Sequence, residues 1–158
     1  MAQQAVSEGG IPGVVALVAR HGKIVHWKAY GKADNQSNRT LKRDDIFRIA
    51  SQTKAITSTA VMMLWEEGKF RLDDPVSKYI PVFKNPRVLS KFQYSDTTYS
   101  TVAATREITI RDLITHTSGI GYGVIDGDER MKMIYKKVGI TDLFTTENIS
   151  IEESVKKL

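Results

Sequence analysis

The sequence predicts a mixed α/β (α+β) protein in which an antiparallel hairpin precedes a set of helices. Two β-rich runs within residues 13–31 are joined by a tight turn, and residues 52–67 have a helical pattern. Capping patterns at residues 109 and 150 predict further short helices. A length of 158 residues suits one domain with a sizeable core, so folding requires no disulfide or structural metal.

The N-terminal part, residues 1–49, is predicted to hold a helix end and the first hairpin. Ala2 to Glu8 has the pattern of a short helix. Residues 14–19 are apolar and β-rich, and residues 23–30 alternate apolar and polar side chains after the turn signal His21-Gly22. Residues 32–45 are polar and predict a surface loop.

Residues 50–158 are predicted to hold a central helix and further helical elements. Residues 46–50, apolar except for Arg48, have the composition of a strand, and a helical pattern follows from Gln52 to Glu67 and ends at Gly68. Apolar side chains occupy nearly every side of this helix, which is typical of a buried helix. Other elements must enclose it, and 158 residues are few for that purpose.

Four weaker patterns complete the expected secondary structure. Asp73 and Asp74, before Pro75, are expected to cap a helix start. Residues 90–106 show no clear period and predict a loop. Thr109 to Asp112 predicts a cap for a helix running to about His116, and Ser150 to Glu153 predicts another.

Composition excludes several classes of function. The absence of cysteine excludes disulfides, thiolate zinc sites and a cysteine nucleophile, but it does not fix the compartment as periplasmic, secreted or cytoplasmic. Three histidines without metal spacing predict no metal, and no cofactor is expected. The net charge of +5 comes from scattered residues and does not predict nucleic-acid binding. No run reaches transmembrane length, and the first residues lack a signal-peptide pattern.

Ser51 and Lys54 form a Ser-x-x-Lys pattern at the predicted start of the central helix. A serine becomes a useful nucleophile when a neighbouring base takes its proton, and lysine serves when it is desolvated. Three residues along a helix, the two side chains share one face, and the positive helix N-terminus disfavours the ammonium form. From the residues alone, a catalytic pair and a plain helix cap with a lysine are equally good interpretations.

The tetrapeptide itself is not specific, because Ser154 to Lys157 matches it too. That second copy lies in a charged segment where a solvated lysine has no reason to lose its proton.

Four ordered blocks resemble the serine hydrolase family of class C β-lactamases, D-alanyl-D-alanine carboxypeptidases and related penicillin-binding-protein-like esterases. They are Gly13 to Gly31, Ile46 to Lys54, Glu66 to Pro81, and Ile110 to Gly119 with its His-Thr-Ser-Gly sequence. The resemblance implies a β-lactamase/transpeptidase-like fold, in which an antiparallel sheet adjoins a helical lobe. It also implies that Ser51 forms an acyl-enzyme on an ester, amide or β-lactam, with Lys54 as base.

By resemblance, the Ser51 backbone N–H is one oxyanion donor, and His116 is a hydrogen-bonded core residue. Tyr122, in the glycine-rich turn that follows, is a candidate substrate contact. The family's Tyr-x-Asn segment and its C-terminal Lys-Thr-Gly or His-x-Gly strand have no match here. The sequence is therefore expected to be the N-terminal part of the enzyme. It would be inactive and poorly folded alone, with the C-terminal part as its partner, present as a second chain or segment.

A second hypothesis is a non-catalytic, peptidoglycan-binding or scaffolding relative that keeps the fold without turnover. It predicts a missing nucleophile or base, whereas Ser51 and Lys54 are both present.

Overall fold

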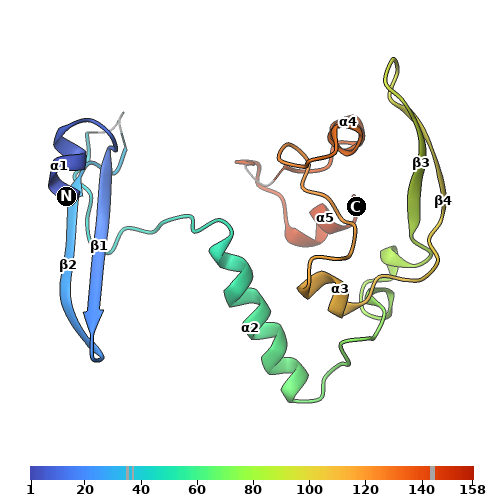
Figure 1. Ribbon diagram of the computed structural model, residues 1–158, viewed down its shortest axis with the longest axis horizontal. Helices are drawn as coiled ribbons and strands as arrows, with labels where there is room; N and C mark the ends of the chain where they lie inside the picture. Colours follow the sequence, from blue (N-terminus) through green and yellow to red (C-terminus); the bar gives the residue numbers. More distant parts are fainter. Residues whose placement is uncertain (35, 37, 143–144) are drawn as a thin grey trace. The chain divides into compact units, whose positions relative to one another are not determined.

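The computed structural model describes residues 1–34, 36, 38–142 and 145–158. The chain divides into two compact units, Met1–Thr53 and Lys54–Leu158 (Figure 1). No helix in the described part of the chain is long and apolar enough to cross a membrane.

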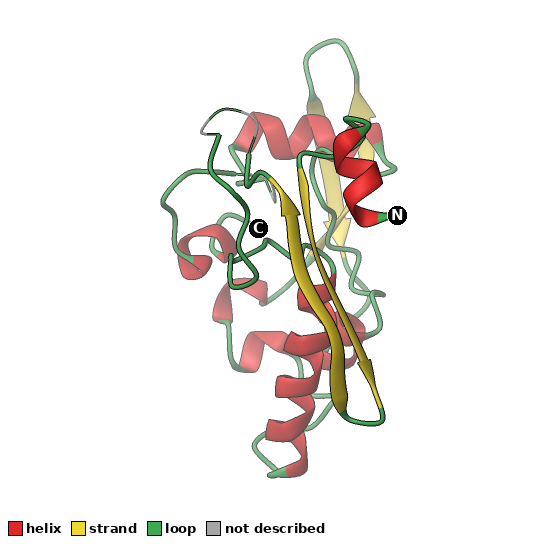
Figure 2. Cartoon of the chain, turned by 90° about the vertical axis from the view of Figure 1, so that its left-hand side faces the viewer, coloured by secondary structure: helices red, strands yellow, loops and turns green. Residues whose placement is uncertain are grey.

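A two-stranded antiparallel sheet forms the first unit. Strands β1 (Gly13–Arg20) and β2 (Lys23–Gly31) pair in register from Gly13 opposite Gly31 to Arg20 opposite Lys23, with an irregularity after Val18. Helix α1 (Ala2–Ser7) packs against this hairpin (Figure 2). The predicted helix end and hairpin are thus confirmed.

Gly31 shows why the hairpin base requires glycine. Its φ is +80°, and a Cβ atom there would lie 2.3 Å from the Pro12 carbonyl oxygen. Leu41, only 7% exposed, covers this base and donates its N–H to the Gly31 carbonyl over 3.1 Å.

Residues 46–50 do not form the expected strand. The side chain of Ile46 is fully exposed and that of Phe47 is half exposed, so an apolar composition alone did not bring this segment into a sheet. Strand pairing needs a neighbour as well as suitable residues.

Helix α2 (Gln52–Glu66) crosses the division between the units and ends before Gly68, whose φ of +71° fits a helix stop. The expected burial of this helix is wrong for the described residues, because none of its residues is buried. Ile56 and Met63 are more than half exposed. No described element of the second unit packs extensively on it, so its apolar sides remain uncovered here.

Two 3₁₀ helices, η1 (Val76–Lys78) and η2 (Pro81–Phe83), follow. The expected capping by Asp73 and Asp74 is wrong: neither side chain caps η1, whose N-cap is Pro75. Asp73 forms an ion pair with Arg111, and Asp74 accepts from the Arg71 N–H, the Tyr79 hydroxyl and the Lys78 ammonium. Both carboxylates therefore stabilise the loop instead.

A second hairpin occupies residues where a loop was expected. Strands β3 (Arg87–Gln93) and β4 (Thr98–Ala103) pair antiparallel with an irregularity after Leu89. Lys137 donates to the carbonyls of Asp96 and Thr97 at the tip of this hairpin, over 3.2 and 2.9 Å.

Three helices complete the second unit: α3 (Ile110–Ile114), α4 (Glu129–Val138) and α5 (Ile151–Val155). Thr109 with Asp112 and Ser150 with Glu153 form the reciprocal capping hydrogen bonds that the sequence predicts for α3 and α5. Helix α4 has no counterpart among the expected elements, although Asp128 caps its start and Gly139 its end.

Candidate active site

Ser51 is the residue immediately before α2, and Lys54 is the third residue of that helix. The turn that starts the helix is closed by two hydrogen bonds, from the Gln52 N–H to the Ile49 carbonyl at 3.1 Å and from the Thr53 N–H to the Ala50 carbonyl at 3.0 Å. Ser51 is exposed and Lys54 is half-buried. The expected position of the pair at a helix start is therefore confirmed.

Ala50, directly before Ser51, has a φ of +44°. Residues other than glycine adopt this left-handed region at a cost, and such conformations cluster at functional sites. A sharp turn at Ala50 places the side chain of the next residue, Ser51, at the N-terminus of α2.

Lys54 and Tyr122 lie together in the second unit. The Lys54 Nζ atom is 5.2 Å from the centroid of the Tyr122 ring, within the range of a cation–π contact. The sequence predicts both as site residues, but they are 68 positions apart, and no sequence pattern indicates that they are in contact. The structure thus brings the candidate base and the candidate substrate contact together.

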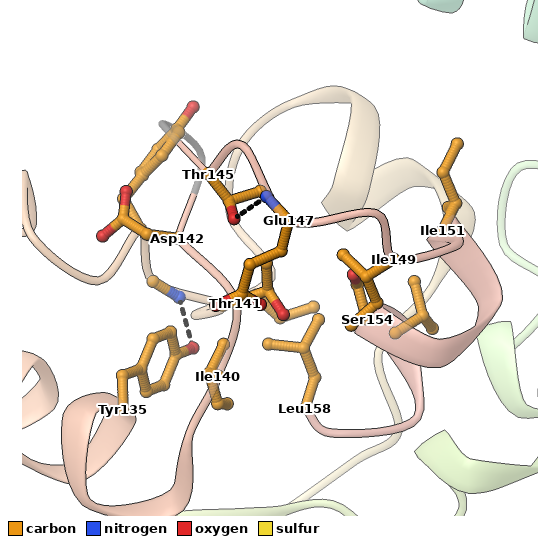
Figure 3. A pocket seen from close by; sticks show the side chains of 14 residues that line it. Tyr135, Ile140, Thr141, Asp142, Thr145, Glu147, Ile149, Ile151, Ser154 and Leu158 are labelled. Carbon is orange, nitrogen blue, oxygen red and sulfur yellow. Dashed lines mark hydrogen bonds between the residues drawn. The ribbon is translucent and has the colours of Figure 1, made fainter.

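Three side chains from elsewhere in the unit hold the loop that carries Tyr122. The Tyr135 hydroxyl accepts from the Gly121 N–H at 3.1 Å (Figure 3). Asp126 accepts from the Tyr122 N–H at 3.1 Å, and Asp142 accepts from the Val124 N–H at 3.4 Å. The position of Tyr122 therefore depends on Tyr135, Asp126 and Asp142, which the sequence did not predict as site residues.

Gly121 leaves room in this loop for the Asp126 carboxylate. A Cβ atom on it would lie 2.2 Å from a carboxylate oxygen of Asp126. The Asp126-Gly127 turn pair was the available sequence signal for this arrangement.

The block from Thr109 to Thr117 is organised by Asp112, which is 7% exposed. Its carboxylate accepts from both Arg106 guanidinium nitrogens, at 2.5 and 2.9 Å, and from Thr109. Arg106 above all, and then Thr109, hold the pKa of Asp112 well below its usual value. This carboxylate stays charged and fixes α3, which is a structural role.

His116 is not the core histidine that was expected. Its side chain is exposed and its backbone φ is +60°. A position at the end of α3, after the last turn, leaves the imidazole outside the packed part of the block.

The second Ser-x-x-Lys copy has a different setting. Ser154 lies within α5, and the Lys157 Nζ donates to the Gly139 carbonyl at 3.2 Å. Lys157 therefore links the segment after α5 to Gly139, the residue that ends α4.

In residues 1–34, 36, 38–142 and 145–158, no group of three or more His, Cys, Asp or Glu side chains is placed to hold a metal ion.

The chain has a hairpin, then a helix that begins directly after Ser51, and later the capped helix α3 followed by the His-Thr-Ser-Gly sequence; this order is that of a β-lactamase/transpeptidase-like fold. The Beta-lactamase family profile matches residues 1–143. The chain belongs to this family.

Three relatives show which members of this family the chain is similar to. The chain is 35% identical to esterase EstB of Burkholderia gladioli over 155 residues, 98% of this chain and 36% of that protein. Among solved structures, EstCE1, a hydrolase with promiscuous acyltransferase activity, matches with a TM-score of 0.71 and 31% identity over 99% of this chain and 37% of that one. Simvastatin synthase (LovD) from Aspergillus terreus matches with a TM-score of 0.67 and 28% identity, over 87% of this chain and 36% of that one.

The chain therefore spans little more than a third of the length of these relatives, and its fold corresponds to part of theirs.

Proposed function

We propose that the protein is a serine hydrolase of the esterase type, with Ser51 as nucleophile and Lys54 as general base. Ser51 Oγ attacks the ester carbonyl carbon while Lys54 takes the hydroxyl proton. The carbon–oxygen bond to the alcohol breaks, and the alcohol leaves with that proton. Water then attacks the acyl-enzyme, releases the carboxylic acid and restores Ser51.

The observation that carries this proposal is the helix start, where an exposed Ser51 follows the left-handed Ala50 and stands three residues before Lys54. The Ser51 N–H, at the positive end of α2, is suited to act as one donor to the oxyanion. Tyr122, whose ring centroid lies 5.2 Å from the Lys54 Nζ atom, is the proposed substrate contact.

An ester is the preferred substrate class within the wider set of esters, amides and β-lactams. Two of the relatives are named an esterase and a hydrolase with promiscuous acyltransferase activity, both descriptions of acyl transfer. By resemblance to the family, the tyrosine of the Tyr-x-Asn segment assists proton transfer and the C-terminal strand gives a second oxyanion donor; both are proposed to come from residues outside this chain. Those residues are also proposed to cover α2.

Covalent labelling tests the nucleophile directly. The intact protein is treated with a fluorophosphonate and digested, and the modified peptide is identified by mass spectrometry. We expect one adduct on Ser51 that is lost in Ser51→Ala. The matched control, Ser58→Ala on the same helix, should keep the adduct. A folded protein that gives no adduct on Ser51 would instead be a non-catalytic member of the family.

A further inference from the structure

A cavity of about 370 Å³ lies in the second unit, beside the loop that carries Tyr122 (Figure 3). Apolar atoms make up most of its wall, which includes six aliphatic residues, although the acidic residues Asp142 and Glu147 also line it. Figure 3 shows Ile140, Ile149 and Leu158 around a common space, and Ile120 and Val155 also line it. A volume and lining of this kind suit a small, largely apolar ligand group.

Polar side chains also line the cavity, among them those of Tyr135 and Thr141. The Tyr135 hydroxyl accepts from the Gly121 N–H, and its own hydrogen has no acceptor among the described residues. The Thr141 Oγ1 atom is buried and has no hydrogen-bond partner in the described part of the chain. A buried hydroxyl without a partner is unfavourable, so a ligand oxygen that reaches it would improve binding.

The cavity adjoins Lys54, the proposed base in the same unit, through one side chain. Tyr122 lines the cavity, and its ring faces the Lys54 Nζ atom at 5.2 Å. A substrate whose carbonyl lies near Lys54 would have this cavity next to it for one of its two substituents.

We propose that this cavity binds an aliphatic chain of the ester substrate, and that Thr141 selects chains that carry an oxygen atom. The inference rests on the proposed esterase function and adds a substrate class to it: esters with a medium-length, oxygen-substituted aliphatic group. The aliphatic group is either the acyl or the alcohol side of the ester, and two substrate series distinguish these sides.

The first experiment fills the cavity. Val155→Phe adds volume to a half-buried lining position, while Val138→Phe makes the same change at an exposed position of α4 that does not line the cavity. In the intact protein, kcat/KM is measured for p-nitrophenyl acetate against octanoate and for ethyl against octyl acetate. Overpacking should lower the long-to-short ratio by about tenfold in one series for Val155→Phe, and Val138→Phe should leave both ratios unchanged.

A fall in the p-nitrophenyl series assigns the cavity to the acyl chain, and a fall in the alkyl acetate series assigns it to the alcohol. Unchanged ratios in both series for a folded Val155→Phe protein overturn the inference while leaving esterase activity in place.

A binding measurement separates the cavity from catalysis. Octanoic acid, 1-octanol and the 3-, 5- and 7-hydroxyoctanoic acids are titrated into the Ser51→Ala protein by calorimetry. At least one hydroxylated acid should bind more tightly than octanoic acid, by about tenfold, and should lose that advantage in the isosteric Thr141→Val variant. Binding without hydrolysis in the unsubstituted protein would contradict the proposed function alone. Hydrolysis of acetate esters without binding of any chain would contradict the inference alone.

Discussion

Ser51 and Lys54 stand at the start of a fifteen-residue helix, whereas Ser154 stands inside a five-residue helix and Lys157 beyond its end. Both pairs have the same spacing in the sequence. The first pair follows a left-handed turn, and its lysine faces an aromatic ring; the second has its lysine bonded to a backbone carbonyl. Spacing therefore selects candidates, while the position relative to a helix terminus and the lysine's neighbour distinguish a proposed site from a structural tie.

The largest expected difference is in acylation. Lys54→Met should lower the rate of fluorophosphonate labelling of the intact protein by about 10²–10⁴-fold, because general-base assistance contributes about that much. Lys157→Met, the same change in the second copy, should leave the rate within about twofold. Equal rates for the two variants would remove the distinction between the copies.

A second difference concerns how each helix begins. Ser150→Ala removes the capping hydrogen bond from the Glu153 N–H to the Ser150 hydroxyl, at a cost of about 1 kcal/mol, while the Ser150 backbone N–H can still donate to the Glu153 carboxylate. Hydrogen exchange should show faster exchange of α5 amides with no change in α2. Ser150→Thr keeps the capping oxygen and should retain most of the protection. Unaltered α5 exchange in Ser150→Ala would mean that packing, rather than the cap, holds this helix.

The turn before Ser51 gives a smaller effect of opposite sign. Ala50→Gly relieves a left-handed conformation, and after allowing for the greater freedom of glycine in the unfolded chain it should stabilise the protein by about 0.5–1 kcal/mol. Ala55→Gly, inside α2, should destabilise it by about 1 kcal/mol. Urea unfolding of the intact protein measures both. Destabilisation by both variants would show that the turn at Ala50 is unstrained.

The smallest effect is the response of α5 to acid. The Ser150 side chain and backbone bond the Glu153 carboxylate and lower its pKa below the usual 4.5. Because the folded-state pKa is depressed, this stabilisation is present above pH 4.5 and is lost as the pH falls through the folded value. Amide protection of α5 should therefore decline below about pH 4.5, and Glu153→Gln should abolish that dependence.

The sequence predicted best the elements that local signals define. The β1–β2 hairpin has a turn pair between alternating runs, and the α3 and α5 caps each combine a hydroxyl with an acid three residues later. The β3–β4 hairpin escaped prediction because most of its side chains are exposed on both faces, so no alternation marks it. Helix α4 also has local signals, because Asp128 caps its start and Gly139 ends it, so this helix is encoded in the sequence as well.

The candidate site was predictable only in its local part. The helix start fixes Ser51 and Lys54, because both follow from a few consecutive residues. The contact between Lys54 and Tyr122, and the support of that loop by Tyr135 and Asp142, join distant parts of the chain. No pattern of spacing encodes such contacts. Apolar composition likewise predicted a buried α2, but burial depends on which elements are present to cover a helix.

The bond from Lys137 to the tip of the β3–β4 hairpin joins residues 40 and 41 positions apart. These hydrogen bonds restrict the motion of a hairpin whose strands, among the described residues, pair only with each other. Closing such a loop costs chain entropy, so the hairpin and α4 should gain or lose order together. Acetylation of Lys137 would remove its positive charge and weaken both hydrogen bonds. The hairpin would then fluctuate independently of α4.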